Sequence, residues 1–314
     1  MAANDSLNKA SAAGVQTECC SPSPCTYTTP SFSGGNMMTE TLRDLYLDLL
    51  KQTLVRWGDD EVLPLSKKGP AAKRLVKYGL NKAVEQMGFQ ICKPVKFDAE
   101  KRTNGRDWPS HAITMIGTKR LDNLRYCVEA ILKENVPGDV IETGVWRGGG
   151  SIFMRAILKA HGDETRNVWC ADSFKGLPQP NVEKYPQDNG LVWHLEDELA
   201  VPLETVKDNF RKFDLLDDQV KFLPGWFKDT LGAAPIDKIS VLRLDGDMYE
   251  STMDALNPLY RKLSPGGFVI IDDYGITQDC CRRAIHDFRA AHGITEPIID
   301  IDGWGAYWRR APRH

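Results

Sequence analysis

A regular alternation of short apolar runs with longer helical patterns occupies the second half of this 314-residue chain and most constrains its fold. Strands that alternate with helices form βαβ units, whose strands lie parallel in one sheet. The runs of strand length that we expect to form the core sheet are 139–142, 167–171, 220–223, 239–244 and 268–271. A closing pair at 298–301 and 306–308, joined through Asp302-Gly303, is expected to form an antiparallel edge. The sequence therefore predicts an α/β fold with a doubly wound, mostly parallel sheet of seven strands.

Three regions are expected along the chain. Residues 1–38 are rich in Ser, Pro, Thr and Gly and lack a hydrophobic period, which is typical of a disordered leader. Residues 39–135 carry helical patterns and are expected to form an N-terminal helical extension and lid region. Residues 136–314 contain the strand–helix alternation and are expected to form the ligand-binding core.

Helices are expected in both the extension and the core. In the first helix, one apolar stripe is predicted from Leu42, Leu45, Leu49 and Leu50. The stretch 67–87 is a weaker helical candidate. A clearer helix begins at Thr118 and ends before Pro137-Gly138. Its apolar stripe consists of Leu121, Leu124, Val128, Ile131 and Leu132. Core helices are expected at 150–160, 251–263 and 278–291.

Acidic residues end four of the five core strands, at Glu142, Asp172, Asp245 and Asp272. In open α/β sheets, ligands bind outside the carboxyl ends of the strands. A protein without such a ligand would end its strands in mixed turn residues. The clustering of acids therefore predicts the functional site at this edge of the sheet.

A glycine-rich turn, ETGVWRGGGS, follows the first core strand from Glu142 to Ser151. Its glycines allow a ligand to approach the backbone closely at the start of a helix. The spacing is not G-x-G-x-x-G, and no G-K-[ST] follows, so a phosphate loop is excluded. Asp172 is placed to bind ribose hydroxyls, or else to cap a turn with Ser173. The two features together favour a phosphate-free, ribose-bearing cofactor with a positive centre, such as a sulfonium.

Four carboxylates follow two strands that we expect to be neighbours: Asp245 and Asp247 after one, Asp272 and Asp273 after the other. Carboxylates that converge repel one another unless a cation neutralises them or some stay protonated. Oxygen ligands suit Mg²⁺ or Ca²⁺, and a site that keeps positions open for substrate favours Mg²⁺. Such an ion lowers the pKa of a bound hydroxyl, and a spare carboxylate can take the proton. Solvated turn acids remain the alternative.

Composition excludes several partners. The net charge of −3 gives no reason to expect a nucleic-acid partner. No run approaches the roughly 20 apolar residues of a membrane span, and the N-terminus lacks a signal-peptide pattern. A cytoplasmic protein is expected.

Several ordered segments resemble the macrocin O-methyltransferase family, which methylates sugar hydroxyls in macrolide and aminocoumarin antibiotic biosynthesis. The matching segments include HAITMIGTKRLDNLRYCVEAIL at 111–132, ETGVWRGGGSIFMRAIL at 142–158, ADSFKGLP at 171–178, FLPGWFKDTL at 222–231, RLDGDMYESTMDAL at 243–256, PGGFVIIDDYG at 265–275 and AYWRR at 306–310. The resemblance covers residues 39–310 and implies a class I methyltransferase fold, S-adenosylmethionine as methyl donor and Mg²⁺ as metal ion. It also implies a homodimer or higher homo-oligomer and a glycosylated small molecule as acceptor.

The resemblance assigns roles to individual residues. The metal ligands are expected to be Asp245, Asp272 and Asp273, and the candidate general base is Asp247, with Asp245 able to share that role. Residues expected near the methyl donor are Glu142, Thr143, Gly144, Arg147, Gly148, Ser151, Asp172, Ser173, Met115 and Asp245. Independently of the resemblance, residues Pro180 to Pro202 are polar and aromatic together and are expected to form a lid over the acceptor. Two departures from the family pattern are the long leader and Asp302-Gly303-Trp304 before the last strand, and both leave the acceptor open.

Three alternatives remain at this stage. A catechol-type phenol O-methyltransferase would use similar metal chemistry on aromatic diols. An NAD-dependent oxidoreductase is disfavoured by the missing glycine fingerprint. A catalytically silent nucleotide-binding module would not need the acids. Cofactor binding separates the oxidoreductase, and metal-dependent turnover separates the other two.

Overall fold

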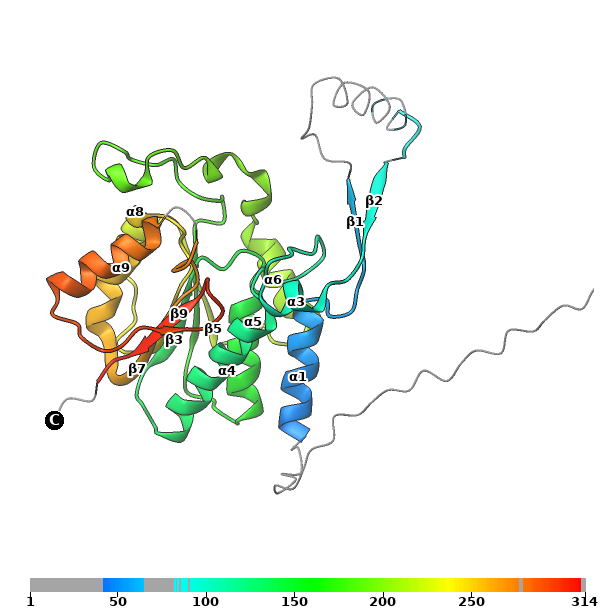
Figure 1. Cartoon of the computed structure of the whole chain (residues 1–314). Coiled ribbons are helices and arrows are strands. Elements are labelled where there is room, and N and C mark those ends of the chain that lie inside the picture. The colour runs from blue at the N-terminus through cyan, green and yellow to red at the C-terminus, as the bar shows by residue number, and fades with distance from the viewer. Residues whose placement is uncertain are drawn as a thin grey trace, which may run out of the picture. The chain divides into compact units, whose positions relative to one another are not determined.

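The computed structural model describes residues 42–64, 82, 84, 86–89, 91–276 and 279–311. Within them, a seven-stranded sheet has the order β5-β4-β3-β6-β7-β9-β8, and Figure 1 shows it at the centre of the core. The five neighbouring strands from β5 to β7 are parallel, whereas β9 pairs antiparallel with both β7 and β8. The strands are β3 (Asp139–Thr143), β4 (Val168–Asp172), β5 (Val220–Pro224), β6 (Ile239–Leu244), β7 (Leu263–Ile271), β8 (Ile299–Asp300) and β9 (Ala306–Arg309). The predicted fold class, with its antiparallel edge, is confirmed.

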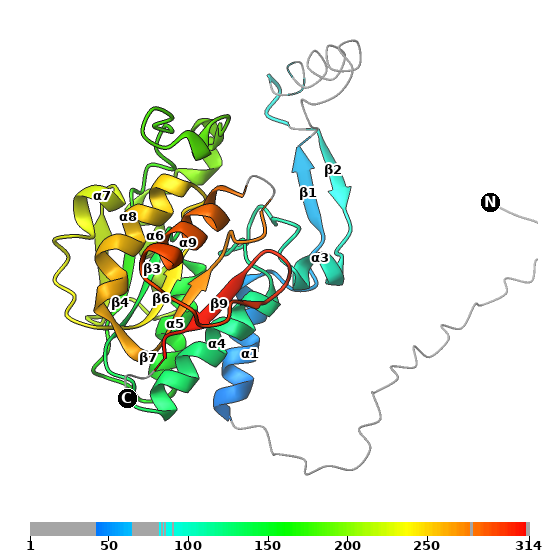
Figure 2. The same ribbon diagram turned by 60° about the vertical axis from the view of Figure 1, so that its left-hand side comes forward.

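Helices cover both faces of this sheet, as the two views in Figures 1 and 2 show. One face packs in a buried cluster with α1 (Leu42–Leu54), α4 (Thr118–Lys133), α5 (Gly149–Ala160) and α6 (Leu203–Lys212). The opposite face packs with α8 (Tyr249–Leu259) and α9 (Cys280–Ala291). All six residues of β6 are buried, because this central strand has helices on both sides. No helix of the described segments is long and apolar enough to cross a membrane.

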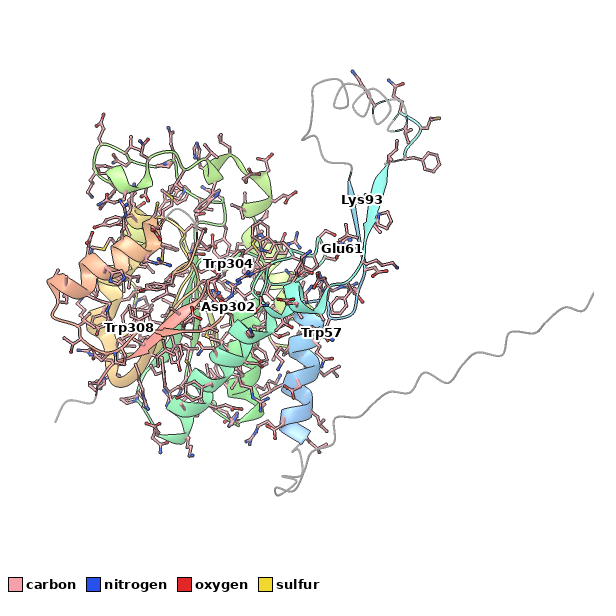
Figure 3. All side chains as sticks on the ribbon, viewed as in Figure 1. Trp57, Glu61, Lys93, Asp302, Trp304 and Trp308 are labelled. Atoms are coloured by element: carbon pink, nitrogen blue, oxygen red, sulfur yellow. The ribbon has the colours of Figure 1, made fainter. Side chains whose placement is uncertain are left out.

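A short antiparallel hairpin, β1 (Glu61–Pro64) with β2 (Cys92–Val95), was not expected from the sequence. Figure 3 labels Glu61 and Lys93 on its two strands and Trp57 just before it. Glu61 Oε2 accepts hydrogen bonds from the backbone N–H and the hydroxyl of Ser110, at 3.1 and 2.7 Å. These bonds join the hairpin to the segment that precedes α4. The predicted leader at 1–38 and most of the helix candidate at 67–87 lie outside the described residues.

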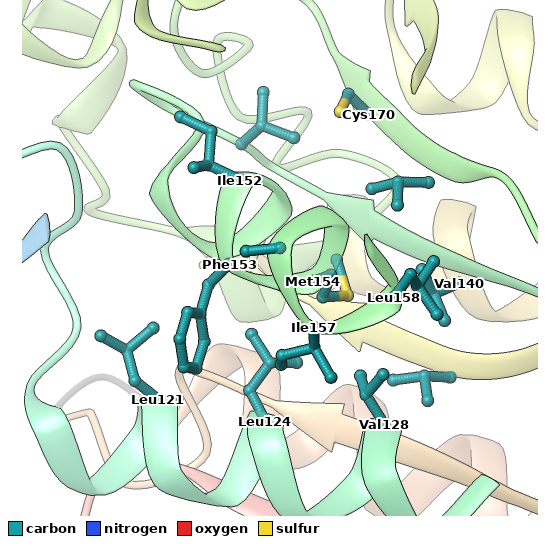
Figure 4. Packing of buried hydrophobic residues seen from close by; sticks show 14 of the residues in the cluster. Leu121, Leu124, Val128, Val140, Ile152, Phe153, Met154, Ile157, Leu158 and Cys170 are labelled. Carbon is teal, nitrogen blue, oxygen red and sulfur yellow. The ribbon is translucent and has the colours of Figure 1, made fainter. Parts of the chain in front are cut away.

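The predicted apolar stripe of α4 is confirmed. Its buried residues pack against α5, and Figure 4 shows Leu121, Leu124 and Val128 of α4 facing Phe153 and Ile157 of α5. All five of these side chains are fully buried. Burial of side chains of this size contributes about 1.5–3 kcal/mol each, so this contact stabilises the face of the sheet that carries the glycine turn.

The predicted stripe of α1 is wrong, although the helix is present. Leu42, Leu45 and Leu49 are 86%, 49% and 66% exposed, and of the predicted stripe only Leu50 is buried. The buried residues of this helix are Leu47, Leu50 and Leu54. Leucines occur on both sides of α1, so spacing alone could not select the inner face.

Polar contacts orient α1. The guanidinium of Arg125 on α4 pairs with Asp44 at 2.5 Å and with Asp48 at 3.4 Å. Lys51 pairs with Asp122 of α4 at 2.5 Å. These ion pairs join α1 to α4, and a prediction based on hydrophobic residues alone does not take them into account.

Two further differences concern the core. No helix was expected where α6 lies, between the expected lid at 180–202 and the expected strand at 220–223. Strand β7 begins at Leu263, five residues before the predicted start, and Pro265-Gly266 lies inside it. The register of β7 against β6 shifts between Ile239 and Val241, and this irregularity accommodates the proline and glycine within the strand.

Candidate functional site

The carboxyl ends of four parallel strands lie in one row. In the register of the sheet, Thr143 of β3 is paired with Leu244 of β6, and Leu244 is paired with Ile271 of β7. The residues that follow these three therefore lie side by side, and they are Gly144, Asp245 and Asp272. The ladder continues through them, since Asp245 N donates to Thr143 O and Asp272 N to Leu244 O, both at 2.9 Å. Thr143 is also paired with Ala171 of β4, which places Asp172 in the same row.

A cavity of about 640 Å³ lies over this row. The predicted site residues that line it are Met115, Glu142, Gly144, Arg147, Asp172, Ser173, Asp245, Asp247, Asp272 and Asp273. Three others, Thr143, Gly148 and Ser151, are not among the lining residues. The structure thus brings most of the predicted site together around one space, which is large enough for a small-molecule ligand.

The glycine turn touches the neighbouring strand end. Gly144 has φ of 87°, and a Cβ at this position would overlap the backbone carbonyl of Asp245. Only glycine tolerates both the positive φ and this approach. The turn therefore lies directly against the backbone of Asp245, which carries the first of the four carboxylates.

Asp172 holds the glycine turn in place. Its Oδ2 accepts hydrogen bonds from Val145 N at 2.8 Å and Trp146 N at 3.3 Å, and its Oδ1 accepts one from Phe174 N at 2.7 Å. The carboxylate thus organises two loops, as the turn-capping alternative expected. It also lines the cavity, where a remaining lone pair is available to a ribose hydroxyl.

The three predicted residues that do not line the cavity support the turn from below. The hydroxyl of Ser151, fully buried, donates to Glu142 Oε2. Thr143 Oγ1 donates to Arg243 O at 3.3 Å. A Cβ on Gly148 would lie 2.9 Å from Val206 Cγ1 of α6, so this glycine allows α6 to pack closely. Ser173 lines the cavity, but its hydroxyl donates to Gly176 O at 2.7 Å.

Three carboxylates converge at the ends of β6 and β7. Asp245, Asp272 and Asp273 each offer an oxygen, and these oxygens lie within 4.8 Å of one another. Asp273 Oδ2 also accepts a hydrogen bond from Asp247 N at 2.9 Å, and Asp247 has φ of 57°. An all-oxygen set of this size fits a hard divalent cation such as Mg²⁺.

Arg243 is a site residue that the sequence analysis missed. It lies on β6 with 2% of its surface exposed. Its guanidinium pairs with Glu142 Oε1 at 2.6 Å, Asp245 Oδ2 at 2.8 Å and Asp272 Oδ1 at 2.6 Å. The available signal was an arginine inside an otherwise apolar strand, because such a charge is buried only with partners.

Arg120 of α4 was also missed. Its Nη1 donates to Asp272 Oδ2 at 2.5 Å, and its Nε to Asp302 Oδ2 at 3.0 Å. The Asp302 carboxylate is fully buried and accepts backbone hydrogen bonds from Trp304 and Gly305. Figure 3 labels Asp302 and Trp304, which belong to the segment that departs from the family pattern. Through Arg120, this segment supports Asp272 of the carboxylate cluster.

The charges of the cluster are unequal. Burial alone would raise the pKa of Asp272, but the guanidinium groups of Arg120 and Arg243 hold it below the ordinary value. Burial and the neighbouring carboxylates raise the pKa of Asp245 and Asp273 well above the ordinary value. Burial and the charge of Asp272 raise the pKa of Asp247 to about 7. The cluster thus carries more carboxylates than its arginines neutralise, which favours binding of a further cation.

The segment expected to form a lid is tied to the core at two places. Asp188, fully buried, accepts hydrogen bonds from Tyr249 N at 2.7 Å and Glu250 N at 3.0 Å, at the start of α8. Trp146 of the glycine turn donates from Nε1 to Glu198 O at 3.0 Å. The residues of this segment from 193 to 199 that line the cavity are Trp193, Glu196, Glu198 and Leu199.

Arg147 ties a second covering segment to the same turn. Its Nη1 donates to Ser110 O at 2.7 Å and Ala112 O at 2.8 Å. Its guanidinium also lies over the ring of Trp146, 4.2 Å from the centroid. Residues of the glycine turn therefore make hydrogen bonds to both segments that border the cavity, and Arg147 binds the backbone of one of them.

Comparisons with known proteins identify the family of this chain. Residues 43–310 match the model of the family described as Macrocin-O-methyltransferase (TylF). The 8-demethyl-8-(2,3-dimethoxy-alpha-L-rhamnosyl)-tetracenomycin-C 4'-O-methyltransferase of Streptomyces olivaceus is 53% identical over 273 residues, which cover 87% of this chain and 95% of that protein. The mycinamicin III 3''-O-methyltransferase of Micromonospora griseorubida is 53% identical over 278 residues, covering 88% of this chain and 100% of that protein. The solved structure of the O-methyltransferase NovP has a TM-score of 0.73 and 45% identity, and the match covers 86% of this chain and 99% of that one.

Proposed function

Because this chain belongs to the macrocin O-methyltransferase family and is an O-methyltransferase, we propose that it methylates a sugar hydroxyl of a glycosylated natural product. Methyltransferases of this family use S-adenosylmethionine. We further propose that a divalent ion, Mg²⁺, is held by Asp245, Asp272 and Asp273.

One observation carries the proposal: the turn that would hold the methyl donor touches the strand end that would hold the metal ion. Gly144 and Asp245 are adjacent in the row of strand ends, without room for a Cβ between them. Methyl transfer requires donor and acceptor to be held close together and in line. A glycine turn and a carboxylate cluster that border one cavity meet this requirement.

The donor set fits the groups that the family implies. When bound, S-adenosylmethionine supplies the methyl group and Mg²⁺ supplies the charge that lowers the pKa of a hydroxyl group. Met115, Gly144 and Asp172 line the cavity and are proposed to hold the methyl donor. Arg243 keeps the carboxylates of Glu142, Asp245 and Asp272 paired and in place.

We propose that Asp247 accepts the proton of the acceptor hydroxyl on one of its carboxylate oxygens. It lines the cavity next to the cluster, and the bond from its N–H to Asp273 fixes its backbone. A pKa of about 7 suits a group that takes up a proton near neutral pH. Asp245, which is paired with Arg243, is less available for this role.

The names of the relatives support a sugar as the acceptor. One relative is named for the 4'-hydroxyl of a rhamnosyl-tetracenomycin, the other for the 3''-hydroxyl of mycinamicin III. We propose a glycoside of this general kind for the present enzyme, with the Pro180–Pro202 segment as the lid over it. A phenolic acceptor, as in catechol-type enzymes, is the second candidate and belongs in the same test.

The function is tested first by binding and then by turnover. Calorimetry is expected to show that the purified protein binds S-adenosylhomocysteine and does not bind NAD⁺. With S-adenosylmethionine and Mg²⁺, methylation of mycinamicin III, of the rhamnosyl-tetracenomycin acceptor and of a catechol is then followed by mass spectrometry. Turnover of a glycoside that stops with EDTA and returns with excess Mg²⁺ is the expected result. Turnover of the catechol alone would refute a sugar acceptor, and EDTA-resistant turnover would refute the metal.

A further inference from the structure

The first turn of α8 lines the cavity with polar groups that the proposed mechanism does not use. Glu250 is 8% exposed and Ser251 is 6% exposed, and both border the cavity beside Asp247. Within the described residues, neither the carboxylate of Glu250 nor the hydroxyl of Ser251 has a hydrogen-bond partner. Both groups open into the cavity rather than being enclosed by protein, so a ligand that fills the cavity would have to supply the hydrogen bonds that water otherwise makes to them.

The helix end does not account for Glu250. An acidic residue in the first turn of a helix often stabilises the free N–H groups there. In α8, however, the carboxylate of Asp188 already accepts hydrogen bonds from the N–H groups of Tyr249 and Glu250. The side chain of Glu250 is therefore free for another role.

The surroundings favour a neutral ligand with hydroxyl groups. Asp254 is one turn further along α8, about 6 Å from Glu250 along the helix axis, and it lines the same cavity. Burial, followed by the charge of Glu250, raises the pKa of Asp254 to about 6, while Lys184 and Lys228 act against this shift. The two lysines face the two carboxylates and Asp229, so this wall of the cavity offers no surplus positive charge that would select an anionic ligand.

An aromatic side chain borders the same wall. A Cβ placed on Gly246 would lie 3.1 Å from Ser251 Cβ and 3.5 Å from Phe227 Cε2, so these three residues meet. Phe227 belongs to the short helix α7 (Phe227–Thr230), and with Trp226 it also lines the cavity. Carboxylate and hydroxyl groups beside aromatic rings complement a sugar, which has hydroxyl groups at its edge and C–H groups on its faces.

We propose that Glu250, together with Ser251, forms a subsite that accepts a hydrogen bond from a second hydroxyl group of the acceptor's sugar. This inference rests on the proposed function, because it concerns the sugar whose other hydroxyl is methylated. Glu250 lies three residues after Asp247 and lines the same cavity, so the two hydroxyl groups belong to the same or an adjoining sugar ring. Glu250 thereby determines which sugars are accepted.

The variant Glu250→Gln keeps the shape of the side chain and removes its charge. Its affinity is measured for mycinamicin III and for the rhamnosyl-tetracenomycin acceptor, in the presence of Mg²⁺ and S-adenosylhomocysteine, by the fluorescence of the tryptophans that line the cavity. We expect binding of the tighter glycoside to weaken at least about tenfold, because a hydrogen bond to a charged carboxylate is replaced by one to a neutral amide oxygen. Binding of S-adenosylhomocysteine is expected to stay within about twofold of wild type.

A matched control is Glu204→Gln, which removes a first-turn glutamate from α6, an exposed helix end that does not line the cavity. It is expected to bind the glycosides like wild type. Monodeoxy analogues of the bound glycoside provide the second arm. One of them should bind wild type as weakly as the parent binds Glu250→Gln, and should lose nothing further in that variant.

The outcomes separate the subsite from the function. Wild-type protein that fails to bind S-adenosylhomocysteine would refute the proposed function itself. If it binds S-adenosylhomocysteine but neither glycoside, or if Glu250→Gln binds the glycoside as tightly as wild type, the subsite is refuted. A Glu250→Gln protein with a lower unfolding temperature and unchanged glycoside affinity would show that Glu250 has only a structural role.

Discussion

Arg243 donates a hydrogen bond from Nη2 to Oδ1 of Asp272 over 2.6 Å, with both residues buried. This bond joins the end of β6 to the end of β7, where the carboxylate cluster begins. Through its other nitrogen, Nη1, the same guanidinium reaches Glu142 below the glycine turn. One cation thus supports both halves of the proposed site.

Replacing Arg243 by Met is expected to destabilise the fold by about 3–5 kcal/mol, because three carboxylates would lose their buried partner. Urea unfolding followed by circular dichroism measures the change. The control is Arg211→Met, since Arg211 is 53% exposed in its pair with Asp208 and such pairs contribute only about 0–1 kcal/mol. Equal effects of the two substitutions would contradict the structural role of Arg243.

Asp272 and Asp273 are expected to respond differently to replacement by Asn. Asp272 is held by two arginines, so Asp272→Asn is expected to lose about 3 kcal/mol of stability as well as metal binding. Asp273 has no arginine partner among the described residues, and an amide oxygen can still accept the bond from Asp247 N. Asp273→Asn is therefore expected to fold like wild type and to lose Mn²⁺ binding, measured by electron paramagnetic resonance. Wild-type Mn²⁺ affinity in this variant would refute the proposed ligand set.

Asp247→Asn tests the proposed general base. Asparagine tolerates the left-handed backbone found at this position, where φ is 57°, so the fold should be retained. Loss of the proton acceptor is expected to lower kcat by about 10²–10⁴-fold, with the affinity for S-adenosylhomocysteine unchanged. A kcat within about threefold of wild type would assign the proton to another group.

Asp188→Ala tests the tie between the lid and α8. The variant loses two hydrogen bonds to backbone N–H groups at a helix start, which is expected to cost about 1–2 kcal/mol. A loosened lid should raise KM for the glycoside several-fold without changing the affinity for S-adenosylhomocysteine. Asp98→Ala is the matched control, because Asp98 caps α3 (Ala99–Thr103) and does not line the cavity. A lid that is independent of Asp188 would give the two variants the same KM.

The fold was predictable because its signals are local. Apolar runs that alternate with helical patterns identified the strands of the main sheet, and the acids at their ends indicated the functional edge. The buried face of α1 was not predictable, since both of its sides carry leucine. Ion pairs that join α1 to α4, Asp44 with Arg125 and Lys51 with Asp122, also orient the helix. The hairpin β1–β2 pairs residues about 30 positions apart, which no local pattern reveals.

The site was also predictable only in part, because some of its contacts join residues that are far apart in the sequence. Residue type and position relative to a strand indicated Asp245, Asp272 and Asp273, which the structure places within reach of one another. The ion pairs of Arg120 and Arg243 depend on sheet register and on the packing of α4, so the sequence contained their residues but not their partners. Ser151 was expected beside the cofactor, whereas its hydroxyl is buried against Glu142.

Two properties of this enzyme depend on different parts of the chain: the distance of methyl transfer and the range of glycosides accepted. The first depends on the row formed by Gly144, Asp245 and Asp272. Neighbouring parallel strands lie about 4.8 Å apart, so under the proposed function the distance from methyl donor to hydroxyl would be set by the spacing of the strand ends. The walls that would contact the glycoside come from other parts of the chain, the lid and α7 among them. Libraries restricted to residues 177–199 and 226–228 should therefore broaden the range of glycosides accepted while the transfer distance stays constant.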